Sequence, residues 1–233
     1  HAASVGLGTV TSHETLTKTG TIDLFPAKAC VSYARCFSIA YHRTHKRLEV
    51  SSAWRNSKET FVYILVPRGH TPPADIPQGA TVIQVPVERM ALHSILWAAF
   101  FPMLNLEQSV VGLSGCNTVS SPEVVSLIRQ GRIQEIGTGG KGMRRPINME
   151  RLMMLKPDAV MIYGTGIRDL DQAPKLLEAG FKPVINASHM EPTPLGHAEW
   201  IKFIAAFFNK ESEAESVFSG IAERYNALAG KTR

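Results

Sequence analysis

Hydrophobic and polar positions alternate in two different ways along the chain. In residues 31–41, 46–50 and 60–66, apolar residues alternate with polar or small ones between turn-rich segments, as in strands with one buried face. From Thr81 onward the pattern changes to short aliphatic runs suited to burial on both faces, at residues 81–87, 109–113, 133–136, 159–163 and 184–186. We therefore expect a small antiparallel sheet followed by a parallel sheet.

Stretches with helical periodicity separate the aliphatic runs. Asn148 and Thr193 are N-cap residues ahead of apolar stretches, and Ser120 with Glu123 matches a capping box. Strands that alternate with helices predict an α/β, Rossmann-like lobe whose parallel sheet is flanked by helices. The expected helices are residues 90–104, 124–130 and 149–155, a stretch that ends at Gly180, one from Pro194 to near Asn209, and a long last helix over about 210–228.

Composition narrows the class of protein. The 233 residues are 44% apolar and 19% charged, enough for a substantial core, and no run of 18 apolar residues exists. The 25 Lys and Arg exceed the 20 Asp and Glu by little and form no block, which argues against nucleic-acid binding. Cys30, Cys36 and Cys116 form no Cys-x-x-Cys pair, so a thiolate metal site is not expected, and their disulfide state stays open.

A glycine-rich loop after the third aliphatic run suggests one alternative function. Gly137-x-Gly139-x-x-Gly142 matches the dinucleotide fingerprint, although residues 143–146 separate it from the helix that Asn148 caps. A Rossmann-like nucleotide-binding enzyme domain that uses the Gly137–Gly142 loop is therefore the alternative function, and an interaction module built on the antiparallel sheet is a third. Nucleophile elbows, paired acids and His-x-x-x-His motifs are absent from the sequence, so no catalytic residue, metal ligand or cofactor is predicted.

Two short motifs carry a family resemblance. Asn148-Met149-Glu150-Arg151, followed by Leu155-Lys156-Pro157-Asp158-Ala159, resembles the periplasmic iron-complex and vitamin B12 substrate-binding proteins of ABC importers, the class with a helical connector. The resemblance covers about 81–228 and implies an N-terminal lobe plus the connector helix, with the C-terminal lobe absent. It divides the chain into a flexible tail (1–27), an antiparallel β decoration (28–69), an α/β ligand-binding lobe (70–196) and a helical segment that includes the connector (197–233).

The expected ligand site lies in the loops at the carboxyl ends of the parallel strands, where α/β sheets bind ligands. These loops carry several cations, which favours an anionic ligand such as an iron chelate or haem, and Met90, Met143 and Tyr163 offer an apolar surface. The cations are Arg89, Lys141, Arg144, Arg145 and Arg168. The predicted ligand-binding residues are Arg89, Met90, Ser114, Gly115, Cys116, Asn117, Lys141, Met143, Arg144, Arg145, Tyr163 and His189.

The resemblance also assigns a docking role to Glu150. Its position matches a glutamate that projects from the lobe and pairs with an arginine of the membrane permease, while a helix macrodipole would equally favour an acid there. The implied protein is extracytoplasmic, lipid-anchored in its precursor, and delivers siderophore-bound iron, haem or cobalamin to the permease. An apolar stripe on a connector without its partner lobe would favour self-association.

Overall fold

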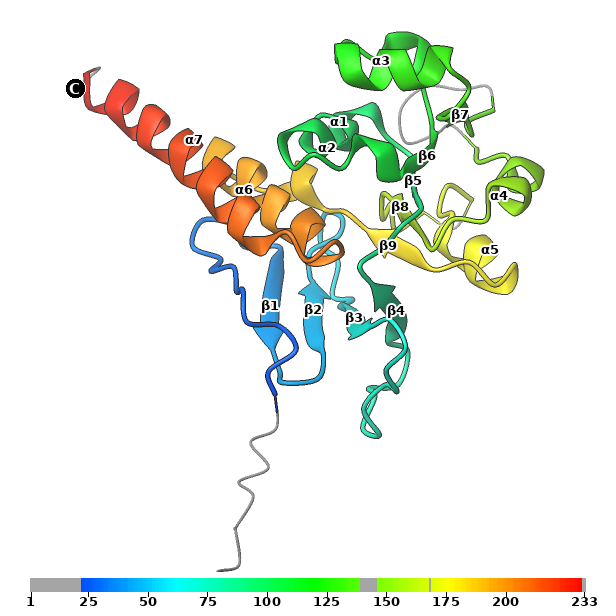
Figure 1. Cartoon of the computed structure of the whole chain (residues 1–233), viewed down its shortest axis with the longest axis horizontal. Coiled ribbons are helices and arrows are strands. Elements are labelled where there is room, and N and C mark those ends of the chain that lie inside the picture. Colours follow the sequence, from blue (N-terminus) through cyan, green and yellow to red (C-terminus); the bar gives the residue numbers. More distant parts are fainter. Residues whose placement is uncertain (1–21, 139–145, 168, 232–233) are drawn as a thin grey trace, which may run out of the picture.

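The computed structural model describes residues 22–138, 146–167 and 169–231, which form two sheets with helices around them (Figure 1). The first sheet, sheet A, has the order β1-β2-β3-β4; its first three strands are antiparallel, and β4 runs parallel to β3. Its strands are β1 (Phe37–Tyr41), β2 (Lys46–Val50), β3 (Phe61–Pro67) and β4 (Thr81–Val85). The three antiparallel strands lie where alternation predicts them.

The second sheet, sheet B, is parallel throughout and has the order β7-β6-β5-β8-β9. Its strands are β5 (Met90–Leu92), β6 (Val110–Leu113), β7 (Gln134–Glu135), β8 (Ala159–Ile162) and β9 (Pro183–Ile185). Because all five strands run the same way, their carboxyl ends meet at one edge, hereafter the carboxyl edge. The α/β fold with a parallel sheet and a small second sheet is confirmed.

One strand assignment is wrong. The run at 81–87 does not enter the parallel sheet, because β4 pairs with β3 of sheet A. Its place is taken by Met90–Leu92, which lies at the centre of sheet B although periodicity predicts a helix there. A run of three apolar residues is too short to show either strand or helix periodicity. Because it directly precedes a helical pattern, the sequence assigns it to that helix. The helix proper begins only after Ser94, whose hydroxyl accepts a hydrogen bond from the Leu96 amide at 3.2 Å.

Side-chain caps mark the starts of three of the described helices, one of which is the helix after Ser94. Asn148 accepts a bond from the Arg151 amide at 2.9 Å, and Thr193 accepts one from the Gly196 amide at 3.0 Å. The expected capping box at Ser120 is wrong, since Ser121 is the N-cap and bonds the Glu123 carboxylate instead. The helices are α1 (Ile95–Ala98), α2 (Phe100–Met103), α3 (Pro122–Arg129), α4 (Met149–Leu155), α5 (Ala173–Glu178), α6 (Pro194–Ala206) and α7 (Glu211–Lys231), with 3-10 turns η1 (Glu107–Ser109), η2 (Cys116–Thr118) and η4 (Ser188–Met190).

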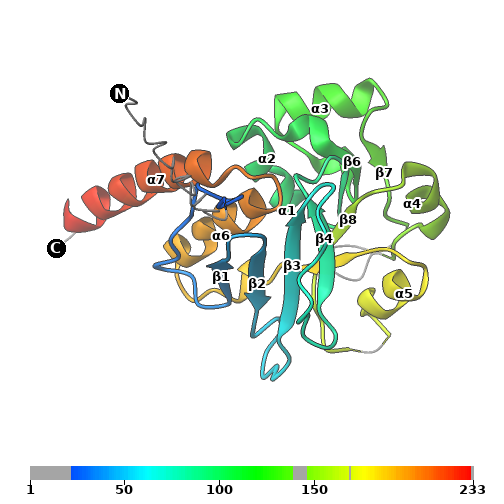
Figure 2. The same cartoon turned by 60° about the horizontal axis from the view of Figure 1, so that its bottom comes forward.

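Helix α6 joins the two sheets into one core. It lies against sheet A and is flanked by α7 (Figures 1 and 2). Phe203 of α6 and its C-cap residue Phe207 meet the Tyr63 ring of β3 at centroid distances of 6.4 and 6.1 Å, and the next residue, Phe208, meets Phe101 of α2 at 5.7 Å. Such buried aromatic contacts on several sides explain why α6 is apolar all round rather than amphipathic.

The last helix, α7, starts in the body of the protein and then leaves it. Asn209, with a φ of 56°, interrupts the helical path at the position that the sequence predicts. From residue 223 to 230 every residue of α7 is exposed (Figure 1). Within the described ranges, we find no helix that combines the length and the apolar character needed to traverse a bilayer.

Candidate functional site

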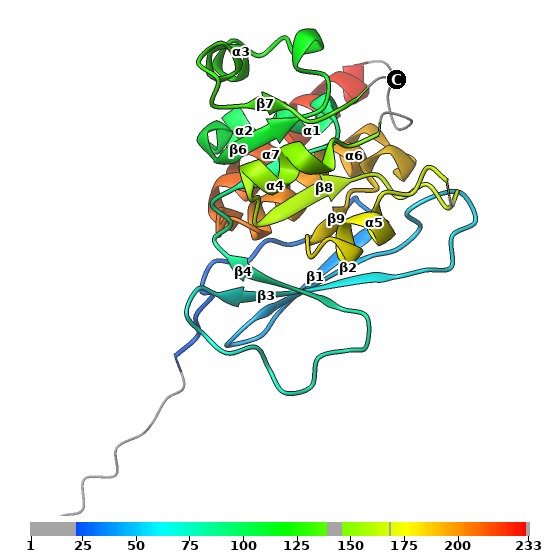
Figure 3. The same ribbon diagram turned by 90° about the vertical axis from the view of Figure 1, so that its right-hand side faces the viewer.

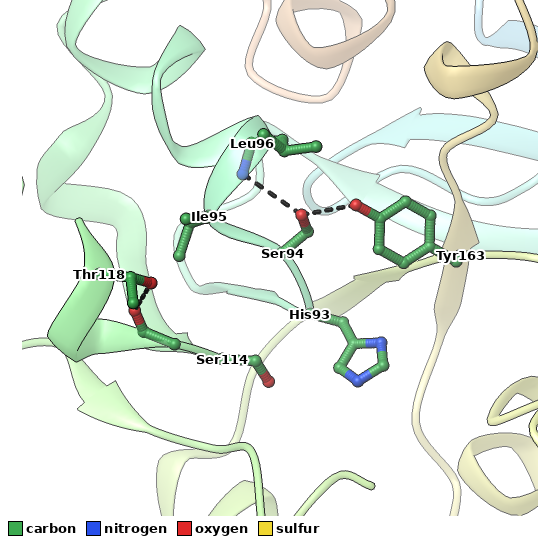
Figure 4. A pocket seen from close by; sticks show the side chains of 8 residues that line it. His93, Ser94, Ile95, Leu96, Ser114, Thr118 and Tyr163 are labelled. Atoms are coloured by element: carbon green, nitrogen blue, oxygen red, sulfur yellow. Dashed lines mark hydrogen bonds between the residues drawn. The ribbon is translucent and has the colours of Figure 1, made fainter. Parts of the chain in front are cut away.

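A pocket of about 240 Å³ opens at the carboxyl edge of sheet B. It lies beyond the ends of β5, β6 and β8, where parallel strands direct their connecting loops into one region. Side chains from three of these loops face one another there (Figure 4). The lining residues are His93, Ser94, Ile95, Leu96, Ser114, Gly115, Thr118 and Tyr163.

Two hydroxyl groups form a pair on one wall of the pocket. The Ser94 and Tyr163 oxygens are 2.7 Å apart, and Figure 4 shows them turned toward each other. The Ser94 oxygen also accepts the Leu96 amide at the start of α1. The two hydroxyl groups together carry two hydrogens. One of these forms the hydrogen bond between them, whichever group is the donor. One hydroxyl hydrogen of this pair therefore has no acceptor in the described part of the chain.

Ser114 adds a third hydroxyl to the pocket. Its side chain is only 5% exposed, and its oxygen has no hydrogen-bond partner among the described residues. A buried hydroxyl without a partner costs about 1–3 kcal/mol, which a bound acceptor oxygen would offset. The neighbouring Thr118 hydroxyl is already used, because it donates to the Gly115 carbonyl at 2.8 Å.

The glycine turn after β6 is held by a carboxylate. Gly115 adopts a φ of 94°, a left-handed conformation that suits glycine. Glu135 accepts hydrogen bonds from the backbone amides of Gly115, Cys116 and Gly137 at 2.7–3.0 Å. These amides therefore bind the protein's own carboxylate, so the hydrogen-bond donors of the pocket that the structure describes are mainly side-chain hydroxyls.

Aromatic rings surround the Tyr163 end of the pocket. The Tyr163 ring lies 4.6 Å from Trp97 and 5.3 Å from His189, measured between ring centroids. Burial raises the pKa of Tyr163, opposed by its bond to Ser94. Burial lowers the pKa of His189, and the nearby His197 lowers it further. This part of the carboxyl edge is therefore uncharged and aromatic at neutral pH.

The structure brings together part of the predicted residue set. Ser114, Gly115 and Tyr163 line the pocket, and His189 contacts Tyr163. Cys116 and Asn117 lie beside it in η2, where the Cys116 thiol points back to the Leu113 carbonyl at 3.4 Å.

Arg89 and Met90 are not at the carboxyl edge, contrary to expectation. Both lie at the amino end of β5, because this strand replaces the one assigned to 81–87. The Arg89 guanidinium donates to the Leu155 carbonyl at 2.6 and 3.0 Å, and Met90 is fully buried. The other predicted positions, Lys141, Met143, Arg144, Arg145 and Arg168, lie outside the described residues.

Sequence reasoning missed His93, Ser94 and Thr118. The available signal for His93 and Ser94 is that they form a polar pair directly after the apolar triplet Met90–Leu92, in a stretch whose periodicity predicts a helix. His93 is 3% exposed and faces Tyr163 at 6.4 Å between ring centroids. No cluster of three or more His, Cys, Asp or Glu suited to a metal ion occurs in the part of the chain that the structure describes.

Glu150 lies at the same edge as the pocket. It is exposed in the first turn of α4, and the Asn148 amide that precedes this helix bonds the Ile136 carbonyl just beyond β7. A carboxylate in the first turn is compatible with both readings of Glu150, docking to a cation of a partner and interaction with the helix macrodipole.

Comparison with known proteins identifies one matching family and several similar proteins. The sequence model described as "periplasmic binding protein" matches residues 107–233. Two uncharacterised lipoproteins of Methanocaldococcus jannaschii are 30% identical over 205 residues (85% of this chain, 49% of the relative) and 28% identical over 158 residues (65% and 37%). A periplasmic haem-binding protein from Pseudomonas aeruginosa is similar with a TM-score of 0.46, at 17% identity, over 62% of this chain and 46% of that one. The chain thus spans less than half the length of each of these three.

Proposed function

Because the chain belongs to the periplasmic binding protein family, we propose that it is the substrate-binding component of an ABC importer and works outside the cytoplasm. The names of the two archaeal relatives support a lipid-anchored precursor. Family membership does not favour the alternative of a nucleotide-binding enzyme that uses the Gly137–Gly142 loop. The importer role includes delivery of a captured ligand to a membrane permease.

The proposed ligand is an iron complex, such as a ferric siderophore or haem, or a related metallated cofactor. The observation that carries this proposal is the pocket at the carboxyl edge, with two hydroxyl hydrogens free for acceptor oxygens and an aromatic wall at Tyr163. At about 240 Å³ it holds one edge of such a ligand rather than the whole molecule. Carboxylate or carbonyl oxygens would enter it, and the Tyr163 ring, backed by Trp97, would contact the organic part. The cations Lys141, Arg144 and Arg145 stay part of this proposal as sequence predictions.

In this proposal α7 is the connector between two lobes. The α/β part of the chain (residues 70–196) would form one face of the ligand cleft, and the helical segment (197–233) would lead to a second lobe that forms the other face. The exposure of residues 223–230 on every side supports this assignment, since a connector spans the space between lobes. A connector helix keeps the lobe separation nearly constant, so ligand capture would involve little closure.

A binding panel tests the ligand proposal. Haemin, cyanocobalamin and ferric ferrioxamine are titrated into the protein and followed by absorbance, with NAD and ATP as the competing class. We expect saturable binding of one metal complex, weakened about five- to tenfold by Ser114→Ala or by Tyr163→Phe, the effect of one lost hydrogen bond. Met154→Ala, an exposed change on α4, serves as the matched control. Binding of a nucleotide and of none of the complexes would reject the importer role.

Glu150 is the proposed contact with the permease. Glu150→Ala should leave ligand affinity unchanged, because the side chain is exposed and does not line the pocket, and should reduce uptake by cells that carry the full-length protein. Glu178→Ala removes an exposed carboxylate at the last residue of α5 and is the control. Loss of ligand binding with normal uptake would assign Glu150 to the ligand site instead.

A further inference from the structure

One tryptophan next to sheet A packs against the segment that carries Tyr163 of the pocket. Trp54 lies in the connection between β2 and β3, and its indole packs on the segment that follows β8. A Cβ placed on Gly164 would lie 3.0 Å from the indole and 3.1 Å from the Ala53 side chain. In Figure 3 the β2–β3 connection reaches the same side of the molecule as the segment between β8 and α5.

The β8 segment is shaped to receive this indole. Gly166 has a φ of 65°, and a Cβ there would lie 2.4 Å from the Trp54 indole nitrogen. Any other residue at this position would both strain the backbone and displace the ring. The two glycines, 164 and 166, thus let a flat ring lie directly on the backbone.

The indole is itself fixed from the side of sheet A. It meets the Phe61 ring of β3 edge to face, at 6.0 Å between centroids, and the preceding Ala53 is fully buried. The indole therefore fixes the distance between sheet A and the segment after β8 on which it lies. That segment begins with Tyr163, whose hydroxyl bonds Ser94 in the pocket.

We propose that Trp54 is a positioning residue of the ligand site: it holds the backbone after β8 so that the Tyr163 hydroxyl stays paired with Ser94. The word "ligand" here rests on the proposed function, whereas the positioning does not. Sheet A then has a role in recognition, because it sets the geometry of one wall of the pocket from outside the parallel sheet.

Hydrogen exchange tests the positioning without any ligand. The amides of Ile167, Leu170 and Asp171 are all hydrogen-bonded to groups of this same segment, at 2.9–3.2 Å. Trp54→Ala should make their exchange at least about tenfold faster, since the brace on the segment is lost. Trp54→Phe keeps a ring and should stay close to the unmodified protein. Arg55→Ala, an exposed neighbour in the same connection, should change nothing.

A second variant covers the case in which Trp54→Ala fails to fold. Gly164→Ala leaves sheet A intact and places a methyl group against the indole, so it should speed exchange of the same three amides. Unchanged exchange in the folded variant, or an equal effect of Arg55→Ala, would overturn the positioning role.

Ligand affinity provides the independent arm. With whichever complex of the haemin, cyanocobalamin and ferrioxamine panel binds, Trp54→Ala should weaken binding about as much as Tyr163→Phe, roughly five- to tenfold. Faster exchange with unchanged affinity would show that the brace acts on the segment but not on recognition, and would refute the proposal. Failure of every complex to bind would count against the importer role while the exchange result stands.

Discussion

Replacement of Lys46 by methionine should destabilise the protein strongly. Lys46 is fully buried in β2, and its ammonium group donates to the Ala206 carbonyl at 2.6 Å, to the Asn209 side chain at 2.8 Å and to the Glu211 carboxylate. Glu211, the first residue of α7, is only 2% exposed. Lys46→Met fills a similar volume but leaves that carboxylate buried and unpaired. Breaking a buried pair on one side costs about 3–5 kcal/mol.

The pH dependence of this variant follows from the same carboxylate. Burial already raises the pKa of Glu211, and Lys46 opposes this effect. Without Lys46 the folded-state pKa rises further above the unfolded value, so folding favours the protonated acid. The destabilisation should be small below the ordinary carboxyl pKa and should grow as pH rises toward the folded pKa, by up to about 1.4 kcal/mol per pH unit.

Urea unfolding followed by tryptophan fluorescence measures both effects, at pH 5 and pH 8. The double variant Lys46→Met with Glu211→Gln should regain at least about 2 kcal/mol at pH 8, since neither partner is then charged. Lys210→Met is the control, because the Lys210–Glu213 pair is partly exposed and should contribute less than about 1 kcal/mol. A cost below about 1 kcal/mol for Lys46→Met at pH 8, with no recovery in the double variant, would refute the reasoning.

Three further outcomes follow from individual side chains. Iodoacetamide at pH 8 should modify the exposed Cys30 but spare Cys36, whose thiol pKa burial raises to about 12; equal labelling in a mass spectrum of the folded protein would contradict this. Stability should fall as pH drops from 6.5 through the lowered pKa of His189, because desolvation beside Tyr163 opposes protonation of this imidazole in the folded state, and His189→Gln should flatten this profile in thermal melts. Gly112→Ala should cost about 1–3 kcal/mol in urea unfolding, because its Cβ would lie 2.7 Å from Ile136; an unchanged midpoint would mean that the core gives way there.

Local signals in the sequence predicted the elements that depend on neighbours along the chain. Asn148 marks the start of α4 because its side chain caps the helix three residues on, and Asn209 marks the break before α7 because asparagine tolerates a positive φ. The end of β8 was equally readable, so Tyr163 was placed at the carboxyl edge, where the structure has it. These are the parts of the fold whose causes lie within a few residues.

What the sequence could not predict depends on contacts between distant segments. Met90–Leu92 is a strand only because β6 and β8 supply hydrogen bonds on both sides, and no pattern within three residues reveals that. The same holds for Trp54, whose partner Gly164 is far away in sequence, and for the pairing of Ser94 with Tyr163. The candidate pocket consists largely of such long-range relations, so its residue types were partly foreseen and its arrangement was not.

The anchoring of α7 has a mechanical consequence. A helix of 21 residues is about 31 Å long, so a tilt of about 5° at its base would swing its far end by roughly 3 Å. Residues at that end would be displaced by about the length of a hydrogen bond. The far end of α7 is therefore positioned accurately only if its first turn is held rigidly. The buried Lys46–Glu211 pair at the start of the helix, with its narrow tolerance for misalignment, supplies that rigidity better than interchangeable aliphatic contacts would.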